Sequence, residues 1–98
     1  MSVLVEFSIF PVDKGDSVSK YVAEVVTYIK NSNFESQLTS MGTIFETEKM
    51  SDALEIINQS YLILSKYSSR IYATAKFDIR DGKNNRILSK ILSVEEKI

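Results

Sequence analysis

The stretch VLVEFSIF, residues 3–10, decides the fold. Its side chains alternate between an apolar face and a mixed face, and the apolar face comprises Val3, Val5, Phe7 and Ile9. A two-residue period with β-branched and aromatic side chains predicts a strand that buries one face. Pro11 ends this strand, because a proline nitrogen has no hydrogen to donate to a neighbouring strand.

Two helices are predicted from the helical spacing of apolar residues. The first begins near Val18, after a cap at Asp16 or Ser17, and ends between residues 31 and 33. The second begins at Ser51 or Asp52. The predicted buried stripes are Val18, Val22, Val25 and Ile29 in the first helix, and Leu54, Ile57, Tyr61 and Leu64 in the second.

The remaining segments complete an α+β pattern. Residues 34–39 and 43–48 are predicted to form a hairpin, residues 71–80 a long strand, and residues 86–97 a C-terminal helix. This order predicts a ferredoxin-like β-α-β-β-α-β sandwich with an extra C-terminal helix. Its four-stranded antiparallel sheet has both main helices on one face, and we expect residues 1–98 to form a single domain.

Composition excludes several classes of activity. The 98 residues contain no Cys and no His, so a disulfide framework, a thiolate nucleophile, a zinc finger and a Ser-His-Asp triad are all excluded. With 12 Lys and Arg against 13 Asp and Glu, the chain lacks the basic field of a nucleic-acid-binding protein. No segment approaches the ~20 apolar residues of a membrane span, and no signal peptide is visible. We expect a cytoplasmic protein that is not an enzyme and that carries neither metal nor cofactor.

One face of the predicted sheet is left uncovered by helices. It carries charged and polar side chains together with apolar ones: Leu4, Glu6, Ser8, Phe10, Ile44, Glu46, Thr74, Lys76 and Asp78. Glu6 and Lys76 are expected to pair across neighbouring strands. Such a mixed face fits either solvent or an interface between subunits. In the second case Glu6, Lys76 and Asp78 are the candidate interface residues.

The same topology gathers polar groups at one rim of the molecule. The rim comprises Ser8–Pro11, Ser17 with Ser19, residues 40–43, and Arg70 with Tyr72. Hydroxyls, free backbone N–H groups and a helix N-terminus suit a small polar ligand. The alternative is structural: the serines cap a helix and Gly42 turns a hairpin. Residue types alone favour the structural interpretation.

The chain resembles a known family at five places. The matching segments are VEFSIFP at residues 5–11, SVSKYVA at 17–23, MGTIFE at 41–46, RIY at 70–72 with KFDIR at 76–80, and KILSV at 90–94. In order and spacing they resemble the small thiamine-binding protein family. That resemblance implies non-catalytic binding of thiamine or its hydroxymethylpyrimidine part. It also implies a homodimer or homotetramer assembled through the sheets.

The resemblance also suggests which residues bind the ligand. Ser8, Ser19, Thr43 and the backbone of Met41 and Gly42 would supply hydrogen bonds. Glu6 or Glu46 would compensate the thiazolium cation. Tyr72, Phe10 or Tyr21 would stack on a ring or hold the cation, although core packing is the favoured interpretation of Phe10 and Tyr21. Two departures affect the expected pocket wall: Tyr61 stands where many members carry His, and Thr39-Ser40 where a Pro often precedes the Met.

Two of these assignments have alternatives. Glu46 can instead form a salt bridge between subunits. More broadly, the motif residues can serve subunit assembly in a structural oligomer that binds no ligand.

Overall fold

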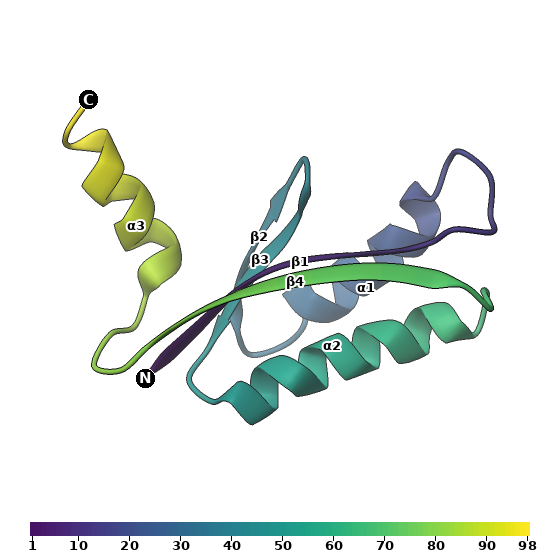
Figure 1. Cartoon of the computed structure of the whole chain (residues 1–98), viewed down its shortest axis with the longest axis horizontal. Helices are drawn as coiled ribbons and strands as arrows, with labels where there is room; N and C mark the ends of the chain where they lie inside the picture. Colours follow the sequence, from purple (N-terminus) through teal and green to yellow (C-terminus); the bar gives the residue numbers. More distant parts are fainter.

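The computed structural model describes residues 1–98 and contains four strands and three helices (Figure 1). Their order is β1 Ser2–Pro11, α1 Ser19–Lys30, β2 Glu35–Thr39, β3 Gly42–Thr47, α2 Met50–Ser65, β4 Ile71–Arg80 and α3 Arg86–Glu95. The predicted β-α-β-β-α-β order with an added C-terminal helix is therefore confirmed. No helix is both long enough and apolar enough to cross a membrane.

The four strands form one antiparallel sheet in the order β2-β3-β1-β4. On one side, β1 pairs with β4 along its whole length, from Ser2↔Arg80 to Pro11↔Ile71. On the other side, β1 pairs with β3 only as far as Phe7↔Thr43. The last four residues of β1 therefore have no partner in the β1–β3 register.

The core lies between the sheet and the two helices α1 and α2, which cover the same face of the sheet (Figure 1). Phe7 and Phe45 meet edge to face with ring centroids 6.2 Å apart. The buried apolar residues are Val3, Val5, Phe7, Ile9, Val25, Ile29, Phe45, Ala53, Ile56 and Leu64. Every residue of the predicted apolar face of β1 is among them.

The predicted buried stripe of α2 is confirmed at Leu64 and in part at Ile57, which is partly buried against the core, and it is wrong at Leu54 and Tyr61. The helix turns Ala53, Ile56 and Ser60 to the sheet, whereas Leu54 and Tyr61 are about half exposed. Small side chains let the helix backbone approach the strands closely. The Ser60 hydroxyl is satisfied locally, because it donates to the Ile56 carbonyl over 2.7 Å.

The predicted cap of α1 at Asp16 or Ser17 is also wrong, and α2 begins at Met50, just before its predicted start. The cap positions are Val18 for α1 and Lys49 for α2, and neither helix has a side-chain capping hydrogen bond. In α2, Asp52 lies within the first turn, where its negative charge interacts favourably with the positive end of the helix dipole.

Helix α3 leaves the sheet on the side opposite to α1 and α2 and stands apart from both (Figure 1). Its first residue, Arg86, is buried, whereas Leu88, Ile91, Leu92 and Val94 are largely exposed. The helix is therefore attached to the sheet mainly through its first turns.

Candidate functional site

The unequal lengths of β1 and β3 create a cavity of about 310 Å³, which we call the hairpin pocket. It lies where β1 continues past the β2–β3 hairpin, with α1 along its side. Its lining comprises Phe7, Ser8, Ile9, Phe10, Val18, Val22, Val25, Val26, Leu38, Thr39, Ser40, Met41, Gly42 and Thr43. The volume is at the lower end of the range for small-molecule sites.

Four of the seven predicted ligand residues meet in this pocket: Ser8, Met41, Gly42 and Thr43. The residue Thr43 as a whole is only 6% exposed. Its hydroxyl is nevertheless not left fully buried without a hydrogen-bond partner. Met41 lies at the hairpin tip and is 82% exposed, so its side chain is free to move over the opening. The hairpin and β1 thus place hydroxyl and thioether groups around one cavity.

Gly42 lets the hairpin lie directly against β1. A Cβ atom at this position would come within 2.6 Å of the Phe7 carbonyl oxygen, and the residue has a φ of +155°. Thr39 fixes the tip from the other strand: its hydroxyl donates to the Gly42 carbonyl over 2.9 Å and accepts the Met41 N–H over 3.2 Å. Sequence reasoning missed this role of Thr39, although a hydroxyl beside a turn is a usual signal for it.

None of the fourteen lining residues is charged, and nine are hydrophobic. The α1 valines, which sequence reasoning assigned to the core, also line the pocket wall. Such a lining suits a flat and largely apolar group. It offers neither a cation for a phosphate nor a carboxylate for a positive charge, and no general acid or base lines it.

Ser19 and Tyr72 do not line the hairpin pocket. Ser19 is exposed at the first residue of α1. Tyr72 lies opposite Phe10 in the β1–β4 ladder, and the two rings pack with centroids 5.7 Å apart. Phe10 contributes to the pocket as well, so Tyr72 can affect the site only through that ring.

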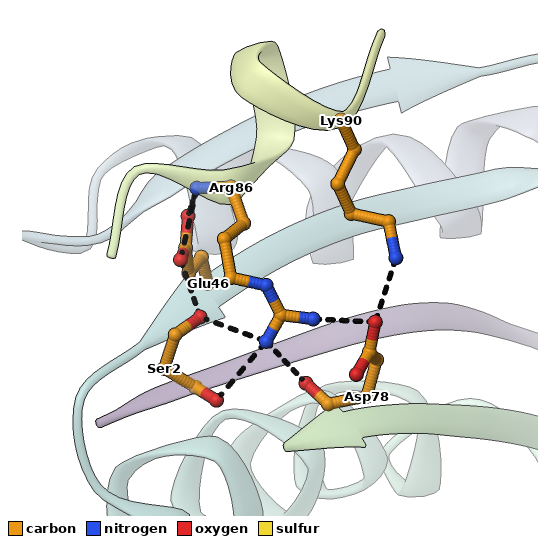
Figure 2. A network of polar contacts seen from close by, with 5 residues as sticks. All are labelled: Ser2, Glu46, Asp78, Arg86 and Lys90. Carbon is orange, nitrogen blue, oxygen red and sulfur yellow. Dashed lines mark hydrogen bonds and ion pairs between the residues drawn. The ribbon is translucent and has the colours of Figure 1, made fainter. Parts of the chain in front are cut away.

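Glu46 lies at the other end of the sheet and takes part in attaching α3 (Figure 2). Its two carboxylate oxygens accept the Arg86 backbone N–H over 2.9 and 3.1 Å, and one also accepts the Ser2 hydroxyl. A carboxylate at this position accepts a hydrogen bond from a free N–H group at the start of α3, and its charge interacts favourably with the positive end of the helix dipole. The structure therefore does not bring Glu46 to the other predicted ligand residues.

The rest of this network is centred on Asp78 (Figure 2). The Arg86 guanidinium pairs with the Asp78 carboxylate and donates to the Asp78 carbonyl over 3.0 Å, while the Lys90 ammonium lies 2.6 Å from the same carboxylate. The Lys90 hydrogen bond, followed by the Arg86 contacts, lowers the pKa of Asp78. The predicted interface residue Asp78 thus bonds within its own chain. The face that was predicted to be free of helices is covered at this end by α3, and the predicted Glu6–Lys76 pair is confirmed at 2.9 Å on the remaining uncovered face.

A second cavity of about 320 Å³ lies near this far end of the sheet. Glu46 is the only predicted ligand residue that lines it, and the neighbouring acidic side chains are Glu35, Glu48 and Asp52. Only two of its eleven lining residues are hydrophobic. The hairpin pocket is the stronger candidate, because it combines apolar walls with four of the predicted ligand residues.

Comparison with known proteins finds a matching family model, sequence relatives and solved structures of the same fold. Residues 5–95 match the family model described as thiamine-binding protein. A UPF0045 protein of Methanothermobacter thermautotrophicus is 31% identical, with 98% of this chain and 99% of the relative covered. The crystal structure of a hypothetical protein from Methanocaldococcus jannaschii, 30% identical, superposes with a TM-score of 0.85 over 97% of each chain.

A Thermotoga maritima structure shares the fold at a TM-score of 0.83 and 13% identity, over 96% of this chain and 99% of the other. Its name assigns that protein provisionally to thiamine biosynthesis or salvage. Since the family model covers nearly the whole sequence and the archaeal relatives align from end to end, this chain belongs to the thiamine-binding protein family.

Proposed function

We propose that this protein binds thiamine or its hydroxymethylpyrimidine part in the hairpin pocket and catalyses no reaction. The observation that carries the proposal is the convergence of Ser8, Met41, Gly42 and Thr43 on one uncharged cavity in a member of this family. A carrier, buffer or sensor needs only such binding.

The proposal is tested by isothermal titration of the purified protein with thiamine and with hydroxymethylpyrimidine. Saturable binding near one ligand per chain is the expected result. Thr43→Val retains the side-chain volume and removes only the hydroxyl, so it should weaken binding more than it lowers stability. Unchanged affinity in a folded Thr43→Val variant would count against this role of Thr43. Silence with both ligands would refute the proposed function.

We also propose that the chain assembles into a homo-oligomer through its sheet. The supporting observation is β4, a ten-residue strand at the edge of the sheet whose backbone has no partner on its outer side. Phe77 and Ile79 of β4 are 39% and 48% exposed, and Leu54 and Tyr61 of α2 are also about half exposed. A long free edge with apolar side chains beside it is a usual site of strand pairing.

Light scattering tests the assembly, and a monomeric mass for the wild type would refute it. Lys76→Glu places a second carboxylate opposite Glu6 on the uncovered face, so we expect it to weaken the oligomer. Lys30→Glu makes the same charge change at the end of α1 and is the matched control. If the oligomer forms but binds neither ligand, the motif residues serve assembly alone.

A further inference from the structure

We propose that the free backbone edge of β1 at Ile9 recognises the ligand. Its peptide N–H and C=O would form a donor–acceptor pair for a flat, neutral heterocycle with an adjacent acceptor and donor, such as an aminopyrimidine. The inference rests on the proposed function, because it states how the same pocket recognises its ligand. It assigns recognition to a backbone group rather than to a side chain.

The direction of the Ile9 peptide groups follows from the alternation of an antiparallel ladder. Val12 donates its N–H to the Arg70 carbonyl over 3.0 Å, so the backbone of Val12 faces the β4 side. Residues two apart along a strand direct their peptide groups to the same side. Phe10 and Ser8 therefore also face β4, whereas Ile9 and Phe7 face the hairpin side. The approach of Gly42 to the Phe7 carbonyl independently supports this assignment.

Ile9 is the first residue on this side that β3 does not reach. The β1–β3 register ends at Phe7↔Thr43, and Ile9 has a ladder partner only on β4, where it lies opposite Ala73. Pro11, the next residue facing the same way, has no N–H. Ile9 therefore presents the one complete donor–acceptor pair on this part of the edge, and it lines the hairpin pocket.

The surroundings make this pair significant for binding. The Ile9 side chain is 5% exposed in the core, and Val18 and Val22 line the same cavity. A peptide group among apolar walls needs a hydrogen-bond partner from outside the chain, and such a bond is stronger there than in water. In a hydrogen-bonded pair of an antiparallel ladder, two residues exchange both bonds. An aminopyrimidine edge can replace the missing residue in that arrangement.

The uncharged lining restricts the ligand further. No carboxylate lines the pocket, and Glu46 lies at the opposite end of the sheet. A cationic ring such as thiazolium gains no charge compensation inside, so it must project from the opening. We therefore expect the aminopyrimidine half of thiamine to account for most of the affinity.

Amide hydrogen exchange measured by NMR tests the free edge without any ligand. The Ile9 amide should exchange at least about tenfold faster than the amides of Val5 and Phe7, which face the same side but have β3 partners. Equal protection of these three amides would overturn the inference.

Titration then tests recognition, with thiamine, hydroxymethylpyrimidine, the hydroxyethylthiazole half, and the same pyrimidine without its amino group as probes. The aminopyrimidine probes should shift the Ile9 amide proton and slow its exchange at least about tenfold, whereas the other two should do neither. A synthetic chain with an ester in place of the Ile9 N–H should bind about tenfold more weakly. Lys30→Ala, a change at an exposed side chain at the end of α1 that does not line the pocket, should leave the Ile9 exchange rate and its response to the probes unchanged.

The outcomes separate the two proposals. If thiamine binds without any effect at Ile9, backbone recognition is wrong and the proposed function stands. If neither thiamine nor hydroxymethylpyrimidine binds, adenine and cytosine serve as further probes with the same donor–acceptor edge. Protection of Ile9 by either would support backbone recognition without a thiamine function. No effect from any probe would overturn both.

Discussion

Replacing Arg86 by alanine should raise the population in which α3 is detached while the core stays folded. The Arg86 side chain is 5% exposed, and its guanidinium pairs with the Asp78 carboxylate. It also donates to the Asp78 carbonyl over 3.0 Å and, more weakly, to the Ser2 carbonyl over 3.5 Å. These contacts tie the first turn of α3 to β1 and β4, and the rest of the helix is largely exposed.

The magnitude follows from those contacts. A hydrogen bond to a charged group contributes about 1.5–3 kcal/mol. The larger penalty of about 3–5 kcal/mol for breaking a fully buried ion pair does not apply, because Asp78 is half exposed and keeps its contact with Lys90. We therefore expect a loss of about 2 kcal/mol in the attachment of α3, which corresponds to a roughly 30-fold rise in its detached population.

Amide exchange resolves this change by element. In Arg86→Ala the α3 amides should exchange about 30-fold faster, while the amides of β1 change little. Lys90→Ala is the control, since Lys90 is 55% exposed and a surface ion pair contributes less than about 1 kcal/mol. Unchanged exchange in α3 would refute the assigned role of Arg86. An equal rise in β1 would show instead that α3 unfolds together with the core.

Three further predictions concern the hairpin, the attachment of α3 at acid pH and the packing of the core. Gly42→Ala should lower the free energy of unfolding by about 1–3 kcal/mol and weaken ligand binding, because the new Cβ meets the Phe7 carbonyl oxygen at 2.6 Å. Urea denaturation measures the first effect and ligand titration the second. A variant as stable as the wild type would contradict the close approach of Gly42 to Phe7. The two cations of α3 lower the pKa of Asp78, so its stabilising effect is complete above the ordinary value of 3.8 and is lost as the pH falls through the lowered pKa. Asp78→Asn should remove this acid dependence of α3 exchange, and an unaltered pH profile would argue against it. Ile56→Ala should cost about 2–5 kcal/mol in urea denaturation, whereas Leu54→Ala, at a half-exposed position of the same helix, should cost under about 1 kcal/mol. Similar losses would contradict the corrected face of α2.

The strands and the topology were predictable because their patterns are local and strong. The alternation in residues 3–10 identifies a central strand, and the observed β4, Ile71–Arg80, has the predicted bounds. The face of α2 was not predictable from apolar spacing, because its contact with the sheet favours the small Ala53 and Ser60 over larger side chains. Neither α1 nor α2 has a side-chain cap, so the cap residues Asp16 and Ser17 did not mark where α1 begins.

The candidate site was partly predictable in the same way. Ser8 and Gly42 meet because the topology brings the end of β1 to the hairpin. Glu46 was misplaced because its motif is contiguous in sequence, whereas a six-residue strand separates its two ends in space. The pocket itself depends on where β3 stops against β1. That register is a property of the paired strands and not of either segment alone.

The place of β1 in the sheet has a consequence for how the chain folds during synthesis. Its first residue, Ser2, pairs with Arg80, and its two neighbouring strands are both made after it. Contacts between residues so far apart in sequence are slow to form, because a long loop must close before they contribute stability. An emerging chain that ends before β4 leaves the apolar face of β1 without one of its two neighbours. We therefore expect the native sheet to form only after residues 71–80 have left the ribosome, with α3 attaching last.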